Sequence, residues 1–298
     1  KLTNSQTHKL TNSQTHKLKN SKTQKLTNSQ TPQLPNSYKM KNIILAAGYA
    51  TRLGELTKNF PKPLLKIGST TILDRMLDDI DTVDDIDEHI LVTNKKFESI
   101  FRQWKRQRLQ GSTGRKPVRI VSDGTETNET RLGAVADLLL AINGQTDTAD
   151  GKGTKPINDD ILVVAADNIL HFHFSEFVEF FKDKGTSCLL CHEQPDVEKL
   201  RRTGVIVVDD QMRVLNMEEK PQEPKSHWAV PPFYIYRQED LPLVRGAVDN
   251  GCGRDAPGNL AHYMVEHTTV HAWPMSAGRF DIGSLDTYYE AIEKYGKD

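Results

Sequence analysis

The pattern of apolar and polar positions divides the chain into two parts with different rhythms. Between residue 41 and about residue 167, short apolar runs alternate with amphipathic segments, which predicts strands separated by helices. Apolar runs without internal alternation are typical of parallel strands that are buried on both faces. The strands expected in this part are 41–47, 89–93, 118–122 and 160–165, and the helices are 71–80, 95–109 and 131–142. This rhythm predicts an α/β fold, a Rossmann-like, mixed but mostly parallel sheet with helices on both faces.

Short strands predominate after residue 167. A hairpin of 204–208 and 212–217 is expected, with further strands at 186–192, 229–236 and 268–273. Helices are expected at 175–181, 241–248, 259–266 and 285–295, and a polar loop at 144–158. We expect both parts to share one sheet, so that residues 39–298 form a single domain with a nucleotide half up to about residue 167 and a substrate half after it.

Residues 1–38 are built from an eight-residue repeat that begins KLTNSQTH. One leucine in eight mostly polar residues buries too little surface to offset the entropy of ordering, so we expect a disordered tail. The first methionine is Met40, directly before the first strand, and we expect translation to begin there. A surface-tethering role is the alternative for the repeat, and its place in the working protein stays open.

Composition and charge exclude several classes of function. The chain has no run of about 18 apolar residues, so no membrane span is expected. Six of the 39 Lys and Arg residues lie in the repeat, which leaves 33 against 40 acidic residues and a net charge of −7 for the rest. A nucleic-acid partner is therefore not indicated. The basic run of Lys105, Arg106 and Arg108 is interpreted as a solvated helix face.

The cysteines indicate a reducing compartment. Cys188, Cys191 and Cys252 form no disulfide framework, and the CxxC of the first two lies in an apolar run that predicts a buried strand. A zinc or redox site there would need further ligands at suitable spacing. We therefore expect a cytoplasmic protein.

The candidate chemistry begins where the first strand ends, in the stretch LAAGYATRL (45–53) followed by NFPKPLL (59–65). Gly48 lets an anion approach backbone N–H groups closely, and Arg52 adds a cation to the same turn. Lys62, held between two prolines, is a second cation. Two cations beside one anion-binding turn suggest a nucleoside triphosphate, although an ordinary turn with solvated charges is the alternative.

Two aspartates are candidates for binding a metal ion. Asp167 follows the apolar strand 160–165, and Asp281 lies in the late segment FDIGS. Either one alone is typical of a helix cap. If both lie near phosphates, the pair can hold Mg²⁺, with water and phosphate oxygens filling the octahedron.

The stretch 45–65 resembles the signature LAxGxGTRLxPLTxxxPKPLL of sugar-phosphate nucleotidylyltransferases, and MEEKP (217–221) resembles the EEKP segment of that family. The resemblance implies the nucleotide-diphospho-sugar transferase fold. It also implies phosphate-handling roles for Arg52 and Lys62 and metal-binding roles for Asp167 and Asp281. The nucleotide-binding residues that it implies are Ala46, Ala47, Gly48, Thr51, Asn128 and Gly133, and the sugar-phosphate-binding residues are Gly204, Glu219 and Lys220.

The implied activity is Mg²⁺-dependent transfer of a nucleotidyl group to a sugar 1-phosphate, in nucleotide-sugar and polysaccharide biosynthesis. The context EEKPxxPKS favours dTTP or UTP and glucose 1-phosphate. A cytidylyltransferase acting on a phospho-alcohol such as phosphocholine, or a non-catalytic nucleotide-sugar sensor, is the alternative. The resemblance allows a homo-oligomer. Ala50 and Pro231-Pro232 depart from the family pattern, where glycine is usual in the phosphate loop and beside the sugar.

Overall fold

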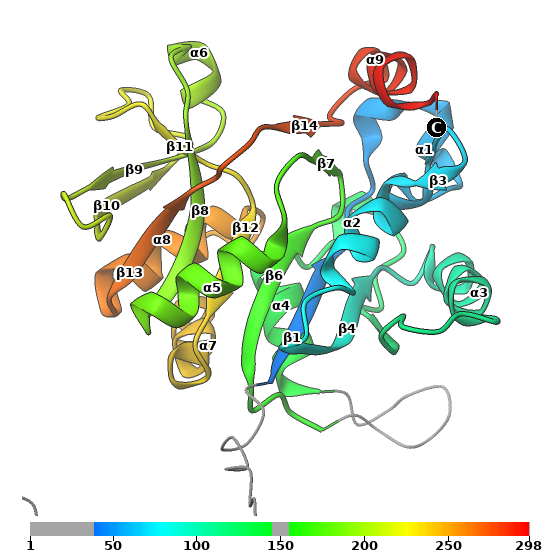
Figure 1. The fold of residues 1–298 in the computed structure, drawn as a ribbon, viewed down its shortest axis with the longest axis horizontal. Helices are drawn as coiled ribbons and strands as arrows, with labels where there is room; N and C mark the ends of the chain where they lie inside the picture. Colours follow the sequence, from blue (N-terminus) through cyan, green and yellow to red (C-terminus); the bar gives the residue numbers. More distant parts are fainter. Residues whose placement is uncertain (1–38, 145–154, 298) are drawn as a thin grey trace, which may run out of the picture. The chain divides into compact units, whose positions relative to one another are not determined.

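A ten-stranded sheet forms the centre of the protein, and its first part is parallel (Figure 1). The computed structural model describes residues 39–144 and 155–297, so the predicted tail at 1–38 and most of the predicted loop at 144–158 lie outside the described residues. The parallel strands are β1 (Met40–Leu45), β4 (Ile86–Thr93), β5 (Val118–Ser122) and β6 (Asp160–Ala165), in the order β6-β1-β4-β5. In the shared register Ile43 lies opposite Ile90 and Val163, all buried, which explains the apolar runs.

The second part of the chain extends the same sheet with mostly antiparallel strands. These are β8 (Ser187–Glu193), β9 (Gly204–Val208), β10 (Val214–Glu219), β11 (Trp228–Val230), β12 (Phe233–Tyr236) and β13 (Val270–Pro274). β12 pairs antiparallel with both β6 and β8, so it joins the two parts, as the expectation of one shared sheet requires. The expectation of one strand over 229–236 was wrong, because Pro231 and Pro232 cannot donate to a ladder and separate β11 from β12.

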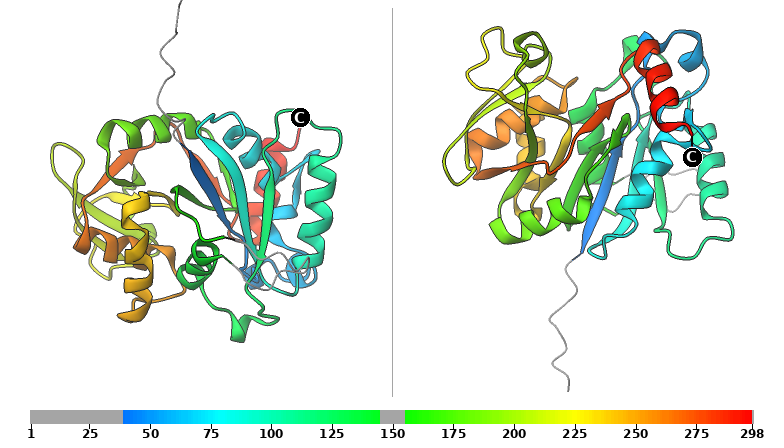
Figure 2. Two further views of the ribbon diagram at one scale, coloured as in Figure 1. Left: turned by 90° about the horizontal axis from the view of Figure 1, so that it is seen from below. Right: turned by 45° about the horizontal axis from the view of Figure 1, so that its top comes forward.

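Helices cover both faces of the sheet, as the alternating pattern predicted (Figure 2). One face packs against α2 (Ile72–Ile80), α3 (Glu98–Leu109) and α5 (Phe174–Lys184), and the other against α4 (Ala134–Asn143), α7 (Leu241–Asp249) and α8 (Pro257–His267). Successive residues of β1 serve opposite faces: Ile44 packs in the first of these cores and Ile43 in the second. The helix expected from residue 131 begins only at Ala134, because Gly133 has a φ of +91° and lies outside the helix.

The end of the chain folds back beside the segment that follows β1 (Figures 1 and 2). The final helix, α9 (Leu285–Tyr295), packs on the hairpin of β2 (Lys66–Ile67) and β3 (Thr70–Thr71), where the Tyr288 hydroxyl donates to the Lys66 carbonyl over 3.0 Å. Just before it, β14 (Arg279–Asp281) pairs antiparallel with β7 (Asn168–Leu170). This pairing places the FDIGS segment next to the carboxyl end of β6. Two short helices, α1 (Glu55–Lys58) and α6 (Val197–Leu200), complete the described helical segments together with four 3₁₀ turns.

Arg108 corrects the interpretation of the basic run on α3. The side chain is buried, donates to Asp74 over 2.6 Å and to Asp81 over 2.7 Å, and lies 3.1 Å from Asp78. Asp81 also accepts a hydrogen bond of 2.8 Å from the buried His89. Burial opposes ionisation of Asp81, but hydrogen bonds from His89 and from a backbone N–H lower its pKa. The charge pattern alone did not reveal that Arg108 belongs to this buried network, whereas Arg106 is exposed as expected.

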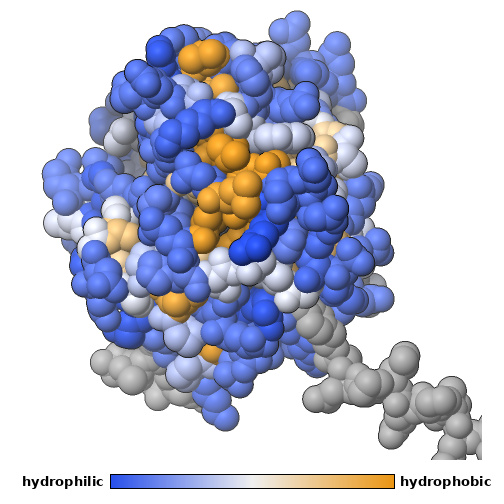
Figure 3. All heavy atoms as spheres, turned by 90° about the vertical axis from the view of Figure 1, so that its left-hand side faces the viewer, coloured by the Kyte–Doolittle hydropathy of each residue, from blue (hydrophilic) through white to orange (hydrophobic). Residues whose placement is uncertain are grey.

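Two further expectations concern the cysteines and a membrane span. Cys188 and Cys191 lie buried in β8, as the apolar run predicted, and burial raises the pKa of both thiols to about 12. Across residues 39–144 and 155–297, the helices are too short or too polar to cross a membrane. The face on the left of Figure 1, where β9 and β10 lie, is mostly hydrophilic around a central hydrophobic patch (Figure 3).

Candidate active site

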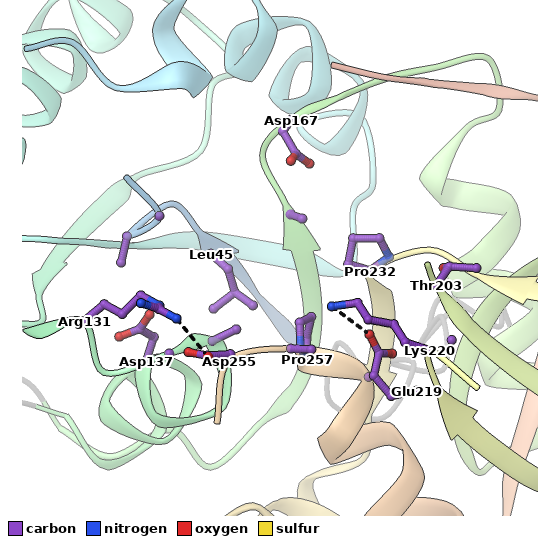
Figure 4. Close-up of a pocket in the computed structure, with 18 of the residues that line it drawn as sticks. Leu45, Arg131, Asp137, Asp167, Thr203, Glu219, Lys220, Pro232, Asp255 and Pro257 are labelled. Carbon is purple, nitrogen blue, oxygen red and sulfur yellow. Dashed lines mark hydrogen bonds and ion pairs between the residues drawn. The ribbon is translucent and has the colours of Figure 1, made fainter. Parts of the chain in front are cut away.

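A cavity of about 510 Å³ opens beyond the carboxyl ends of β1 and β6 (Figure 4). Ligands of open α/β sheets bind at such an edge. Residues predicted to serve the nucleotide and the sugar phosphate line it together: Ala47, Gly48, Arg52, Asn128, Gly133, Asp167, Gly204, Glu219 and Lys220. Arg131 and Asp137 lie toward one end and Glu219 and Lys220 toward the other, with Asp167 just beyond the end of β6. The sequence predicted these segments separately, and the fold brings them to one cavity.

The turn after β1, predicted to bind phosphate, leaves open space at Gly48 and has a left-handed residue at Ala50. A Cβ at Gly48 would meet no atom of the described residues within 4 Å, so the space in front of this backbone is open. Ala50 adopts a left-handed conformation with a φ of +47°, which costs about 1 kcal/mol for a residue other than glycine. The Thr57 hydroxyl donates to the Ala50 carbonyl over 2.8 Å and helps to hold this conformation. The left-handed conformation therefore explains why the family has glycine at this position, and alanine adopts the same conformation at some energetic cost.

Arg52 and Lys62 meet at a second, smaller cavity of about 220 Å³ that adjoins the same turn. Ala46 and Asp167 also line this cavity. Thr51 lines a neighbouring hollow together with Lys58 and Lys96, and Lys62 does not line this hollow. Both predicted catalytic cations therefore lie beside the turn that follows β1.

Lys62 and Asp167 form the best-defined contact of the site. Lys62 is nearly buried, and its Nζ lies 3.0 Å from Asp167 Oδ2. The other carboxylate oxygen, Oδ1, accepts a hydrogen bond of 2.7 Å from the side chain of Asn168. The carboxylate thus has a fixed orientation at the end of β6, with a cation already against it.

The pairing of β7 with β14 brings the second aspartate to the first. Asp281 lies opposite Asn168 in the ladder, and the Ile282 N–H donates to the Asp167 carbonyl over 3.1 Å. Partial burial and the negative charge of Asp167 raise the pKa of Asp281. The described residues hold no group of three or more His, Cys, Asp and Glu side chains that could bind a metal ion by itself. Two neighbouring carboxylates that repel each other nevertheless fit a hard cation that takes its other ligands from phosphate and water.

The end of the cavity that is predicted to bind the sugar phosphate is organised around Glu219. This residue ends β10 opposite Gly204, where an added Cβ would lie 3.3 Å from Glu219 Oε2 and 2.9 Å from Met217 Cε. A Cβ on Gly258 would overlap the same carboxylate oxygen, so both glycines are needed for its position. Burial raises the pKa of Glu219. Lys220 follows with its side chain exposed to the cavity and its Nζ 3.7 Å from Glu219 Oε1.

Sequence analysis did not identify the segment around Gly258 as part of the site. Pro257 and Gly258 line the cavity at the start of α8, and Arg202 and Thr203 line it before β9. The helix expected over 259–266 begins at Pro257, and the sequence alone did not reveal which edge of the sheet this start would face.

The predicted base segment is fixed across the cavity to the loop before α8. Arg131 Nη2 donates to Asp255 Oδ2 over 2.9 Å, and the Val135 N–H donates to the Arg254 carbonyl over 3.0 Å. A Cβ on Gly133 would lie 2.5 Å from that carbonyl oxygen, so only glycine fits here. These contacts explain a glycine that the resemblance had assigned to base recognition.

Asp137 is a residue of the site to which the sequence analysis gave no role. It lies in the first turn of α4, its backbone N–H donates to the Gly133 carbonyl over 2.9 Å, and its side chain is 6% exposed. Its Oδ1 has no hydrogen-bond partner among the described residues. Burial and the charge of Asp123 raise the pKa of Asp137 to about 7. A single aspartate in the apolar run AVADLLLAI was the available signal.

Comparisons with solved structures confirm the fold. A putative glucose-1-phosphate thymidylyltransferase from Bacillus anthracis superposes with a TM-score of 0.68 at 22% identity, covering 87% of this chain and 96% of that one. A UDP-glucose pyrophosphorylase gives the same TM-score at 19% identity, covering 87% and 98%. At these identities the likeness shows the shared fold.

Curated relatives resemble the chain over most of its length. A glucose-1-phosphate adenylyltransferase of Fervidobacterium nodosum is 27% identical over 269 residues, which cover 84% of this chain and 60% of the relative. A putative mannose-1-phosphate guanyltransferase of Sulfolobus acidocaldarius is 29% identical over 241 residues, covering 81% and 59%. The chain thus spans about three fifths of the length of these relatives. Residues 41–298 match the family model described as nucleotidyl transferase, so the chain belongs to the nucleotidyl transferase family, as the resemblance in its sequence indicated.

Proposed function

We propose that the protein transfers a nucleotidyl group from a nucleoside triphosphate to a sugar 1-phosphate, with release of pyrophosphate. The observation that carries this proposal is the contact between Lys62 and Asp167, with Asp281 beside it. Asp167 of this group also lines the cavity that the predicted base segment shares with Glu219 and Lys220. The family membership supports the same reaction class, and the names of the relatives include several sugar-1-phosphate nucleotidyltransferases.

The reaction needs positioning and charge neutralisation more than covalent chemistry. An oxygen of the sugar phosphate attacks the α-phosphorus, a new P–O bond forms, and the bond to the β-phosphate breaks so that pyrophosphate leaves. We assign Arg52 to the β- and γ-phosphates and Lys62 to the α-phosphate. Lys62 is held at the cavity by Asp167, so its ammonium group is positioned before the substrate arrives.

Asp167 and Asp281 are the residues that would hold Mg²⁺. When bound, the ion neutralises phosphate charge and orients the phosphate oxygens. The raised pKa of Asp281 beside Asp167 is the feature of this chain that fits a cation, because a positive charge relieves the repulsion between the two carboxylates.

The sugar phosphate is assigned to the other end of the cavity. Glu219, fixed between Gly204 and Gly258, is oriented to accept hydrogen bonds from sugar hydroxyls. Lys220 offers the cation that brings the sugar phosphate close to the triphosphate. Ala46, Ala47, Gly48 and Thr51 are proposed to contact the triphosphate, and Asn128 and Gly133 the base.

The sequence favoured glucose 1-phosphate with dTTP or UTP as substrates. The relatives add ATP and GTP as candidates for the nucleotide and mannose 1-phosphate as a candidate for the sugar, since two of them are named an adenylyltransferase and a guanyltransferase. We keep glucose 1-phosphate as the first sugar to test, because both the first relative and the first solved structure carry it in their names.

The test is pyrophosphate release by the full chain with Mg²⁺ across ATP, GTP, CTP, UTP and dTTP, each combined with glucose 1-phosphate, mannose 1-phosphate and phosphocholine. Release that requires one sugar 1-phosphate supports the proposal. Release only with phosphocholine would move the protein to the phospho-alcohol class, and nucleotide binding without any release would support a sensor. Lys62→Ala should lower the rate of pyrophosphate release. Lys182→Ala, which changes an exposed lysine paired with Asp85, is the control for this substitution.

A further inference from the structure

The end of the cavity that holds Arg131 and Asp137, which we call the base end, is acidic. It contrasts with the turn at Gly48 and Arg52, where we place the phosphates. Tyr49 lines the base end, and its hydroxyl lies 3.1 Å from Thr125 Oγ1. Burial raises the pKa of Tyr49, and the negative charges of Asp123, Glu126 and Asp137 raise it further. Of these three carboxyl groups, Asp137 lines the cavity, and Glu126 lines a neighbouring hollow that Tyr49 also borders. The cation at this end, Arg131, is directed to Asp255 and to the Asn128 carbonyl.

Asp137 is the carboxyl group that reaches this end of the cavity from α4. It lines the cavity together with Leu45, Asn128 and Gly133, and Figure 4 shows it at the same end of the cavity as Arg131. Oδ1 is fully buried and is left without a donor by the described residues. Because Oδ1 has no surface open to the cavity, a ligand N–H would reach this carboxyl group through its other oxygen, and a donor supplied to a largely buried acceptor gains affinity.

The choice of base follows from what a carboxyl group can do in each protonation state. Its oxygen accepts an N–H whether the group is neutral or ionised. It can donate to a keto oxygen only while it is protonated, and in its ionised form it repels keto oxygens. Adenine, guanine and cytosine carry an exocyclic amino group, whereas uracil and thymine present two keto oxygens around one N–H.

We propose that Asp137 is a specificity-determining residue that accepts a hydrogen bond from the exocyclic amino group of the base. The substrate is then ATP, GTP or CTP in preference to UTP or dTTP. This inference rests on the proposed function and replaces the preference for dTTP or UTP that the EEKP context favoured. A carboxylate also matches the two adjacent N–H groups of guanine, so GTP is the first of the three to test.

The test measures the dissociation constants of ATP, GTP, CTP, UTP and dTTP by titration calorimetry with the full chain and Mg²⁺, without any sugar phosphate. We expect at least one amino-bearing nucleotide to bind about 10-fold or more tightly than UTP and dTTP. Asp137→Ala should reduce this ratio to about 3-fold or less. Asp137→Asn keeps an acceptor and adds a donor, so it should retain the amino-bearing nucleotide and improve the binding of UTP and dTTP.

Asp240→Asn is the matched control, since Asp240 is a similarly buried aspartate that accepts a 2.6 Å hydrogen bond from Ser187 and does not line the cavity formed by the described residues. It should leave the ratio between nucleotides unchanged. Tightest binding of UTP or dTTP, or an unchanged ratio in Asp137→Ala, overturns the inference. If UTP binds most tightly and pyrophosphate release still depends on a sugar 1-phosphate, the inference is overturned while the proposed function stands. If no nucleotide binds, both are overturned.

Discussion

Asp137→Asn is expected to stabilise the folded protein more at pH 8 than at pH 5. In the folded protein the pKa of Asp137 is raised to about 7 from the ordinary 3.8, because the carboxyl group is buried and lies near Asp123. The folded state therefore binds this proton more tightly than the unfolded state, and Asp137 costs stability as the pH rises from 3.8 to 7.

The size of the effect follows from the difference between the two pKa values. The cost of Asp137 to the free energy of unfolding is about 1.5 kcal/mol at pH 5 and about 4 kcal/mol at pH 7 and above. Asparagine does not titrate, so the variant avoids this cost. We expect the gain in stability to grow by about 2–3 kcal/mol between pH 5 and pH 8. Effects of the substitution that do not depend on pH cancel in this difference.

The assay is urea unfolding of the wild type and Asp137→Asn at pH 5, 6, 7 and 8, with the free energy of unfolding extrapolated to water. The same comparison in an Asp123→Asn background should give a smaller rise with pH, because the charge of Asp123 contributes to the raised pKa of Asp137. A difference between the two proteins that stays flat from pH 5 to pH 8, or that shrinks, would refute the reasoning.

Three further substitutions test other contacts. Lys62→Ala should lower kcat about 10²–10³-fold in the pyrophosphate assay while the melting temperature stays close to wild type; near-normal turnover would contradict its role. Gly133→Ala, with its Cβ 2.5 Å from the Arg254 carbonyl, should weaken nucleotide binding in calorimetry, and unchanged affinity would count against the fixed base segment. Arg108→Met should cost about 3–5 kcal/mol in urea unfolding, because Asp81 and its neighbours lose their buried cation; a loss below about 1 kcal/mol would contradict this account.

The elements with a single clear pattern were predictable from the sequence. β5 and β6 have the predicted bounds, and their branched apolar residues are buried in the sheet. α9 also has its predicted bounds, with Ser284 capping its first turn. The start of α4 was not predictable from periodicity, since the positive φ of Gly133 depends on a carbonyl contributed by the loop before α8.

The parts of the site that the sequence did not reveal depend on contacts between distant segments. The motif residues Gly48, Arg52 and Lys62 were found because they follow one another closely in the chain. Gly258 was missed because its importance comes from the Glu219 carboxylate, which belongs to another strand. Asp137 was missed because one polar residue in an apolar helix carries no information about whether it faces solvent or a cavity.

The most direct test of the central claim follows the α-phosphate. The full chain is incubated with Mg²⁺, glucose 1-phosphate or mannose 1-phosphate, and each nucleoside triphosphate labelled at the α-phosphorus. The account predicts that the label moves into a nucleoside diphosphate sugar, with one pyrophosphate released for each label transferred. It also predicts that this transfer is about 10²–10³-fold slower in Lys62→Ala. Label that ends in nucleoside monophosphate, or transfer that persists undiminished without Lys62, would contradict it.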